Sequence, residues 1–347
     1  MAINTAMHAA LKALSYPDVN LKKTYKLARK VEKLAHPYYL RPFYKTWDHK
    51  LHFEDHEIPV RIFSDAVESE DIERPLLLFF HGGGWVLGDI NTYNNVCASL
   101  AKLTGCRVVS VDYRLAPEYK FPAGLEDCYF AAKEIILNAK KHFGVESDQV
   151  TLIGDSAGGN FCAAVSLMAK DRGEFSPARQ ILLYPAVNND FSEHSEFDSI
   201  RENGTDYLLT IKKLCDYMEL YQSSPADREN PYFAPYLAKD LSGQPHTLII
   251  TAQFDPLRDE GEAYARRLLE EGNVVRLHRI KDVLHGFFSL PIGFEPVMEC
   301  YHCINDFLKS EGICPKPYQR KEEKTKQRVK KVLKKQREGH SVKLKIK

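Results

Sequence analysis

The amino-acid sequence predicts an α/β fold, with a mostly parallel sheet and helices on both of its faces. Two observations support this prediction. Short, continuous runs of Val, Ile, Leu and Phe, which are typical of buried parallel strands, alternate with longer segments of helical periodicity. The length of 347 residues also lies within the range of one large α/β domain.

The individual elements follow from these patterns in chain order. Two short segments are expected to begin the sheet as an antiparallel pair, at 49–53 and 60–63. The apolar runs that follow predict further strands, at 75–80, 107–113, 150–153, 181–184, 246–251 and 274–280. The helical patterns predict helices near 92–104, 123–143, 158–172, 258–272 and 294–310.

Two segments interrupt this alternation. Residues 1–50 are rich in Lys and Tyr and are mostly helical by pattern. Residues 188–240 separate two strands by far more than an ordinary connection, so they are expected to be an insertion with a helix of its own. We therefore expect an N-terminal helical segment over 1–50 and a core over 51–315 that carries the insertion.

Charge is distributed unevenly along the chain. Residues 316–347 contain fourteen Lys and Arg against three Glu, a net charge of +11, whereas the whole chain carries only +1. The preceding 315 residues therefore carry −10. Blocks of like charge are typical of solvated tails, so we predict a disordered basic tail over 316–347. Its charge would suit an anionic membrane or nucleic acid, and a mobile tail without a partner is the alternative.

Cysteine usage and apolar runs favour a cytoplasmic protein. No segment approaches the ~18 to 20 uninterrupted apolar residues of a membrane span, and the N-terminus lacks the pattern of a signal peptide. The eight cysteines are scattered, unlike those of a disulfide scaffold. Cys300 and Cys303 form a C-x-x-C pair in a helical stretch, but a structural zinc site requires four ligands. We expect them to pack in the core, and we expect no metal site.

The sequence GDSAG at 154–158 lies between an expected strand and an expected helix. This is the G-x-S-x-G pattern in the context of a sharp strand-to-helix turn, which lifts the serine hydroxyl above the edge of the sheet. Glycines are needed on both sides because the turn is strained and its neighbours pack closely. We infer that Ser156 is a nucleophile, and a glycine-rich turn with an incidental serine is the alternative.

An earlier strand runs directly into His81-Gly82-Gly83-Gly84-Trp85. Glycines allow a loop to present backbone N–H groups to a developing oxyanion. Gly83 and Gly84 are the preferred donors together with Ala157, and Gly82 is the near alternative. A phosphate-binding loop is disfavoured because no G-x-G-x-x-G or G-K-[ST] pattern follows.

The base is expected last in the chain, because the order serine, acid, histidine belongs to this kind of turn. His285 follows the last expected strand, whereas His278 lies inside that strand and His302 inside the last helix. His81 is expected to orient the glycine loop. Asp255 follows the strand at 246–251 and is the preferred acid. Asp259, in the first turn of the next helix, and Asp282 are the alternatives. Five apolar residues near the motifs are candidate pocket walls, with core packing as their alternative role: Trp85, Leu87, Phe161, Leu284 and Phe287.

These motifs together resemble the hormone-sensitive-lipase-like family of carboxylesterases, which has the α/β-hydrolase fold. Further matches are DYRLAPE at 112–118, FPA at 121–123 and DPLRDEGEAYARRL at 255–268, and the resemblance covers roughly 75–310. It implies a core of about eight strands, with a helical cap built from 1–50 and the insertion. It also implies cofactor-free hydrolysis of short- to medium-chain acyl or acetyl esters. Dimers are common in the family, and the basic tail departs from the family pattern.

Two other classes of function compete with the esterase. Some relatives in this family are hormone receptors that lack the catalytic histidine, but this chain has a serine, an acid and a histidine at the matching positions. An interaction protein tethered by its basic tail would account for the tail and leave the three residues unexplained.

Overall fold

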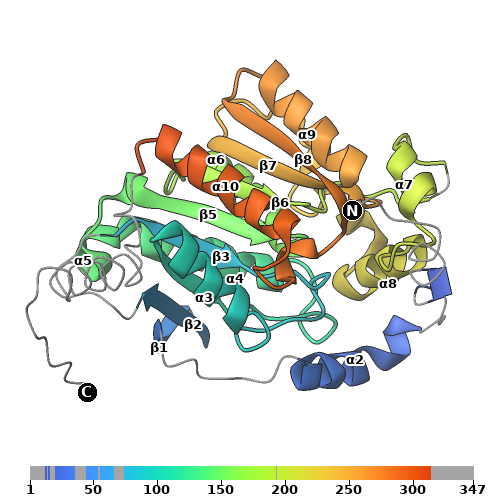
Figure 1. Ribbon diagram of the computed structural model, residues 1–347, viewed down its shortest axis with the longest axis horizontal. Helices are drawn as coiled ribbons and strands as arrows, with labels where there is room; N and C mark the ends of the chain where they lie inside the picture. The colour runs from blue at the N-terminus through green and yellow to red at the C-terminus, as the bar shows by residue number, and fades with distance from the viewer. Residues whose placement is uncertain are drawn as a thin grey trace, which may run out of the picture. The chain divides into compact units, whose positions relative to one another are not determined.

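The computed structural model describes residues 12–13, 15, 20–35, 44–53, 55–65, 74–192 and 194–313. Its centre is an eight-stranded sheet with the strand order β1-β2-β4-β3-β5-β6-β7-β8 (Figure 1). β2 pairs antiparallel with β1 and with β4, and all other neighbours are parallel. The predicted mostly parallel α/β fold is confirmed. The strands are β1 (Tyr44–Phe53), β2 (His56–Asp65), β3 (Leu76–Phe80), β4 (Arg107–Val111), β5 (Val150–Asp155), β6 (Arg179–Leu183), β7 (His246–Phe254) and β8 (Val275–Leu284).

Helices cover both faces of this sheet because alternate residues of each central strand point in opposite directions. In β3, Leu76, Leu78 and Phe80 contribute to one apolar cluster, and Leu77 and Phe79 to the other. The first cluster includes residues of α4 (Ala123–Leu137), α6 (Ala157–Arg172) and α9 (Arg258–Glu270). The second includes residues of α3 (Asn94–Thr104) and α10 (Glu295–Ser310), Cys300 among them. β3 is buried on both faces, which explains its continuous apolar sequence.

The helix expected over 123–143 is two helices, α4 and α5 (Ala139–Phe143). They are separated at Asn138, whose side chain donates a hydrogen bond to the carbonyl oxygen of Glu134 at 3.1 Å. Asparagine side chains compete with the backbone for such partners, so the chain turns here instead of continuing one helix.

The N-terminal boundary expected at residue 50 is wrong. β1 begins at Tyr44 and pairs with β2 along its whole length, from Tyr44 opposite Asp65 to Phe53 opposite His56. β1 is an edge strand, and most of its described side chains are half-buried or exposed, including Trp47. Such a strand has no continuous apolar run, so only its last residues were predicted.

Outside the sheet, helices form in both segments that interrupt the alternation. α2 (Leu21–Ala35) lies in the N-terminal segment, and α7 (Asp198–Asn203) and α8 (Ile211–Tyr221) lie in the insertion between β6 and β7. α2 and α8 are neighbours (Figure 1), and Lys22 of α2 forms an ion pair with Glu219 of α8 at 2.6 Å. None of the helices in the described ranges is long and apolar enough to cross a membrane. The expected basic tail, 316–347, lies outside the described residues.

Candidate active site

The turn between β5 and α6 presents Ser156 at the edge of the sheet. The backbone of Ser156 has φ of 54° and ψ of −118°, a region that non-glycine residues rarely adopt. Its N–H donates a hydrogen bond to the carbonyl oxygen of Leu183 at 2.8 Å, which holds the turn against β6. A Cβ at Gly154 would overlap the carbonyl oxygen of Gly158, and a Cβ at Gly158 would overlap that of Phe80. Both glycines are therefore required by close packing.

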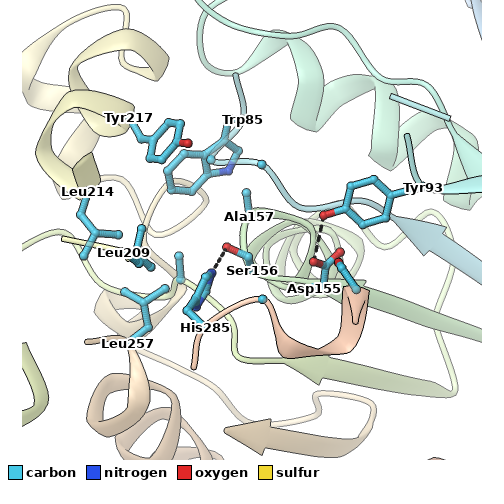
Figure 2. A pocket seen from close by; sticks show the side chains of 15 residues that line it. Trp85, Tyr93, Asp155, Ser156, Ala157, Leu209, Leu214, Tyr217, Leu257 and His285 are labelled. Atoms are coloured by element: carbon cyan, nitrogen blue, oxygen red, sulfur yellow. Dashed lines mark hydrogen bonds between the residues drawn. The ribbon is translucent and has the colours of Figure 1, made fainter. Parts of the chain in front are cut away.

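Three of the predicted residues form one hydrogen-bonded chain. Asp255 follows β7 and His285 follows β8, so both lie at the same edge of the sheet as Ser156. His285 Nδ1 lies 2.7 Å from Asp255 Oδ2. On the other side of the ring, His285 Nε2 lies 2.8 Å from Ser156 Oγ (Figure 2). Asp255 is fully buried, and its other carboxylate oxygen accepts the N–H of Leu257 at 2.9 Å. This is the geometry of a nucleophile, a base and a group that orients the base.

The alternative acids have other partners. Asp259 accepts the N–H of Ser199 at 2.7 Å and forms an ion pair with Arg258. Asp282 is bonded through its N–H to the side chain of Gln253 at 2.9 Å. Of the acids considered from the sequence, only Asp255 is placed against His285.

The alternative bases are also engaged elsewhere. His81 is completely buried, and burial lowers the pKa of its ring, which favours the neutral imidazole. It donates from Nδ1 to the carbonyl oxygen of Gly82 at 2.8 Å and stacks on Tyr113 at 4.2 Å between ring centroids. His278 bonds to Glu299 on α10. The geometry of His81 agrees with the expected role of orienting the glycine loop.

The glycine loop supplies two of the three preferred donors beside Ser156. Gly83, Gly84 and Ala157 all line the same cavity as Ser156. Within the described part of the chain, no acceptor is found for their N–H groups. Gly82 is a correction to the prediction, because its N–H donates to Asp155 Oδ1 at 2.8 Å and Gly82 does not line the cavity. That N–H is already satisfied and is not available to an oxyanion.

Asp155 and Tyr93 are site residues that sequence reasoning missed. Asp155 Oδ2 accepts a hydrogen bond from the hydroxyl of Tyr93 at 3.0 Å (Figure 2). Its Oδ1 accepts the N–H of Gly82. The Asp155 carboxyl therefore ties the nucleophile turn to the glycine loop. Burial raises its pKa to about 6 in spite of these hydrogen bonds. Asp155 occupies a variable position of G-x-S-x-G, so the motif does not indicate its role. Tyr93 directly precedes α3 and belongs to no motif that would single it out.

The cavity beside Ser156 has a volume of about 150 Å³. Trp85 is the single predicted wall residue that lines it. Phe161 and Phe287 are instead packed in the core, and Leu87 and Leu284 are half-buried outside the lining. An apolar residue near a motif looks the same in sequence whether it faces a core or a cavity. The remaining lining residues, also missed, are Ala186, Leu209, Leu214, Tyr217, Leu257, Gly286 and Ser289.

The insertion and the N-terminal helix both touch the glycine loop. A Cβ at Gly84 would lie 2.5 Å from the ring of Tyr217, so α8 rests directly on this glycine. On α2, Arg29 donates from Nε to the carbonyl oxygen of Val86 at 2.7 Å, and Glu32 accepts the N–H of Gly88 at 3.0 Å. These contacts hold the loop in place at Gly84, Val86 and Gly88.

Comparisons with known proteins agree with this arrangement. A family model described as the alpha/beta hydrolase fold matches residues 77–289. An arylesterase of Saccharolobus solfataricus is 39% identical over 251 residues, which cover 72% of this chain and 79% of that protein. An ethyl acetate hydrolase of Pseudomonas putida is 32% identical over 238 residues, covering 68% of this chain and 73% of the other. The solved structure of a hyperthermophilic esterase from Pyrobaculum calidifontis is 37% identical, with a TM-score of 0.78, and covers 90% of this chain and 100% of its own.

Proposed function

We propose that this chain, which belongs to the hormone-sensitive-lipase-like carboxylesterase family of the α/β-hydrolase fold, uses Ser156 to form an acyl-enzyme. The protein is a carboxylic ester hydrolase. One observation carries the assignment of residues: Asp255, His285 and Ser156 form a continuous hydrogen-bonded chain beside three N–H groups without a protein acceptor in the described ranges.

The reaction begins when Ser156 Oγ attacks the ester carbonyl carbon. His285 Nε2, at 2.8 Å, accepts the serine proton, and Asp255 holds the imidazole through Nδ1 and stabilises the imidazolium. The N–H groups of Gly83, Gly84 and Ala157 donate to the oxyanion of the tetrahedral intermediate. His285 then gives its proton to the alcohol, which leaves as the C–O bond breaks. Water repeats the sequence on the acyl-enzyme and releases the carboxylic acid.

The size of the cavity supports small acyl groups. Its volume of about 150 Å³ is below the ~300 to 1,000 Å³ of pockets for drug-sized ligands. Its walls are Trp85, Leu209, Leu214 and Leu257 together with the ring of Tyr217 (Figure 2). The preferred substrates are therefore esters of short to medium acyl chains. In this proposal α2 and the insertion act as the cap, an assignment supported by the contacts of Arg29 and Tyr217 with the glycine loop.

A series of p-nitrophenyl esters with acyl chains of two to twelve carbons tests this proposal (roughly the range that separates pockets of this size). We expect kcat/KM to be highest for the short members and to fall steeply for the long ones. A maximum at the longest chain would contradict the assignment of this cavity to the acyl group. A fluorophosphonate should form its adduct on Ser156, as located by peptide mass spectrometry, and an adduct on another serine would contradict the assignment of the nucleophile.

A further inference from the structure

We propose that the outer face of α2 docks on an anionic lipid surface. Three apolar side chains, Leu27, Val31 and Leu34, are spaced four and three residues apart and so lie on one side of the helix. They are 61%, 56% and 79% exposed, although apolar residues at this spacing usually face a core.

Lysines line one edge of this apolar stripe. At 100° per residue, Lys23, Lys26 and Lys30 lie next to Leu27 and Leu34 on the surface of the helix. All three lysines are exposed, and none forms an ion pair with a carboxylate in the described part of the chain. An exposed apolar stripe bordered by lysines is the pattern of a helix that lies in a membrane interface.

The opposite face of α2 packs on the rest of the protein, so its contacts hold the outer face toward the surface. Leu21 is buried in the core, and Arg29 bonds to the carbonyl oxygens of Val86 and Ala116, each at 2.7 Å. Glu32, the single carboxylate of α2, accepts the N–H of Gly88. The outer face therefore presents apolar and cationic groups and no acid of its own helix.

This combination favours a bilayer over a polyanion. Nucleic acid would attract the lysines but would leave three apolar side chains in water. An anionic bilayer attracts the lysines through its headgroups and buries the apolar stripe at the acyl boundary. The same helix holds the loop at Gly88, so docking would place the cavity at Ser156 close to esters dissolved in the lipid. The binding itself does not depend on the proposed function.

Co-sedimentation with vesicles of phosphatidylglycerol and phosphatidylcholine, using the full chain, tests the lysine edge. Each lysine near an anionic surface contributes roughly fivefold to the partition coefficient. Changing Lys23, Lys26 and Lys30 together to Gln should therefore lower it by about 100-fold. The matched control changes the exposed Lys239, Lys281 and Lys309 to Gln, which removes the same charge elsewhere and should leave α2-dependent binding in place. Equal losses in the two triple variants would overturn the proposal.

Insertion of the apolar stripe must be measured separately, because the basic tail could bind anionic vesicles through charge alone. With Leu27→Trp, the emission gained over the wild type, which has Trp47 and Trp85, should be quenched by brominated phosphatidylglycerol by at least about half. The reason is that an interfacial helix inserts its apolar face ~5 to 10 Å. Leu137→Trp, at an exposed position of α4, is the control and should remain unquenched. All variants should hydrolyse a small soluble ester at the wild-type rate, whether or not vesicles bind. Absence of quenching at position 27, or binding to duplex DNA in place of vesicles, would overturn the proposal.

Discussion

At the residue scale, the strained backbone of Ser156 places its hydroxyl within 2.8 Å of His285. Ser156→Ala removes the proposed nucleophile and keeps the turn, so we expect the protein to fold and to lose ester hydrolysis by ~10⁴- to 10⁶-fold in kcat. Steady-state kinetics and circular dichroism of the purified variant check both parts. A variant that retained a tenth of the wild-type turnover would remove Ser156 from the mechanism.

The two aspartates near the end of β7 can be separated in the same way. Asp255→Asn leaves the imidazole of His285 in the wrong tautomer and should cost ~10³- to 10⁴-fold in kcat. Asp259→Asn removes an ion pair with Arg258 and a bond to Ser199, so it should affect stability more than turnover. Both variants should be assayed at the same pH, with Tm as the second measurement. Similar losses of kcat in the two variants would mean that the contact at 2.7 Å does not identify the acid.

At the scale of elements, α8 supplies Tyr217 as a wall of the cavity. Tyr217→Ala should open the cavity, so that the ratio of kcat/KM for an octanoyl ester to that for an acetyl ester rises by about tenfold, as expected when a few methylene groups gain space. Tyr217→Phe keeps the ring and is the control, and its ratio should match the wild type. If both variants kept the wild-type ratio, the acyl group would have to bind elsewhere.

The turns that carry the motifs were predictable because each is constrained locally. Gly154 and Gly158 are required because a Cβ at either position would overlap a neighbouring backbone, that of Gly158 or that of Phe80. His285 follows an apolar strand, in the chain order of serine, acid and histidine that is typical of the fold. The pocket walls were not predictable, because Leu209 and Leu214 reach the cavity only through the tertiary placement of the insertion. β1 escaped prediction for a related reason, since an exposed edge strand carries no apolar run.

At the scale of the whole molecule, Glu260 makes stability depend on pH. It is fully buried in the first turn of α9, and its Oε1 accepts the N–H groups of Val187 and Asn188 at 2.7 and 3.2 Å. Its Oε2 has no hydrogen-bond partner among the described residues, and burial raises the pKa of the carboxyl to about 8. The folded state thus keeps a proton that the unfolded chain loses above its ordinary pKa of 4.5. The free energy of unfolding should therefore fall as pH rises from about 4.5 to about 8.

Glu260→Gln tests this dependence, because glutamine imitates the protonated acid and cannot ionise. We expect the variant to match the wild type near pH 5 and to have a Tm higher by several degrees near pH 8.5. A shift of several pKa units is worth several kcal/mol, and ~1 kcal/mol corresponds to about 1 to 2 °C in a chain of 347 residues. Thermal unfolding at both pH values measures the difference. An increase in Tm that is the same at both pH values would mean that Glu260→Gln acts through packing and not through the proton held by the Glu260 carboxyl.

The residues that shape the cavity and the residues proposed to react lie in different parts of the chain, because the insertion between β6 and β7 supplies much of the cavity wall. The proposed nucleophile, acid and base follow the ends of β5, β7 and β8. By contrast, Leu209, Leu214 and Tyr217 come from one continuous stretch within 188–240. Replacing that stretch with the corresponding stretch of a relative would exchange much of the wall of the cavity that we propose for the acyl group. The three reacting groups would stay in place at the ends of their strands. The same exchange can occur in evolution: a single recombination event in this stretch can change the ester preference of the enzyme while its catalytic groups remain unchanged.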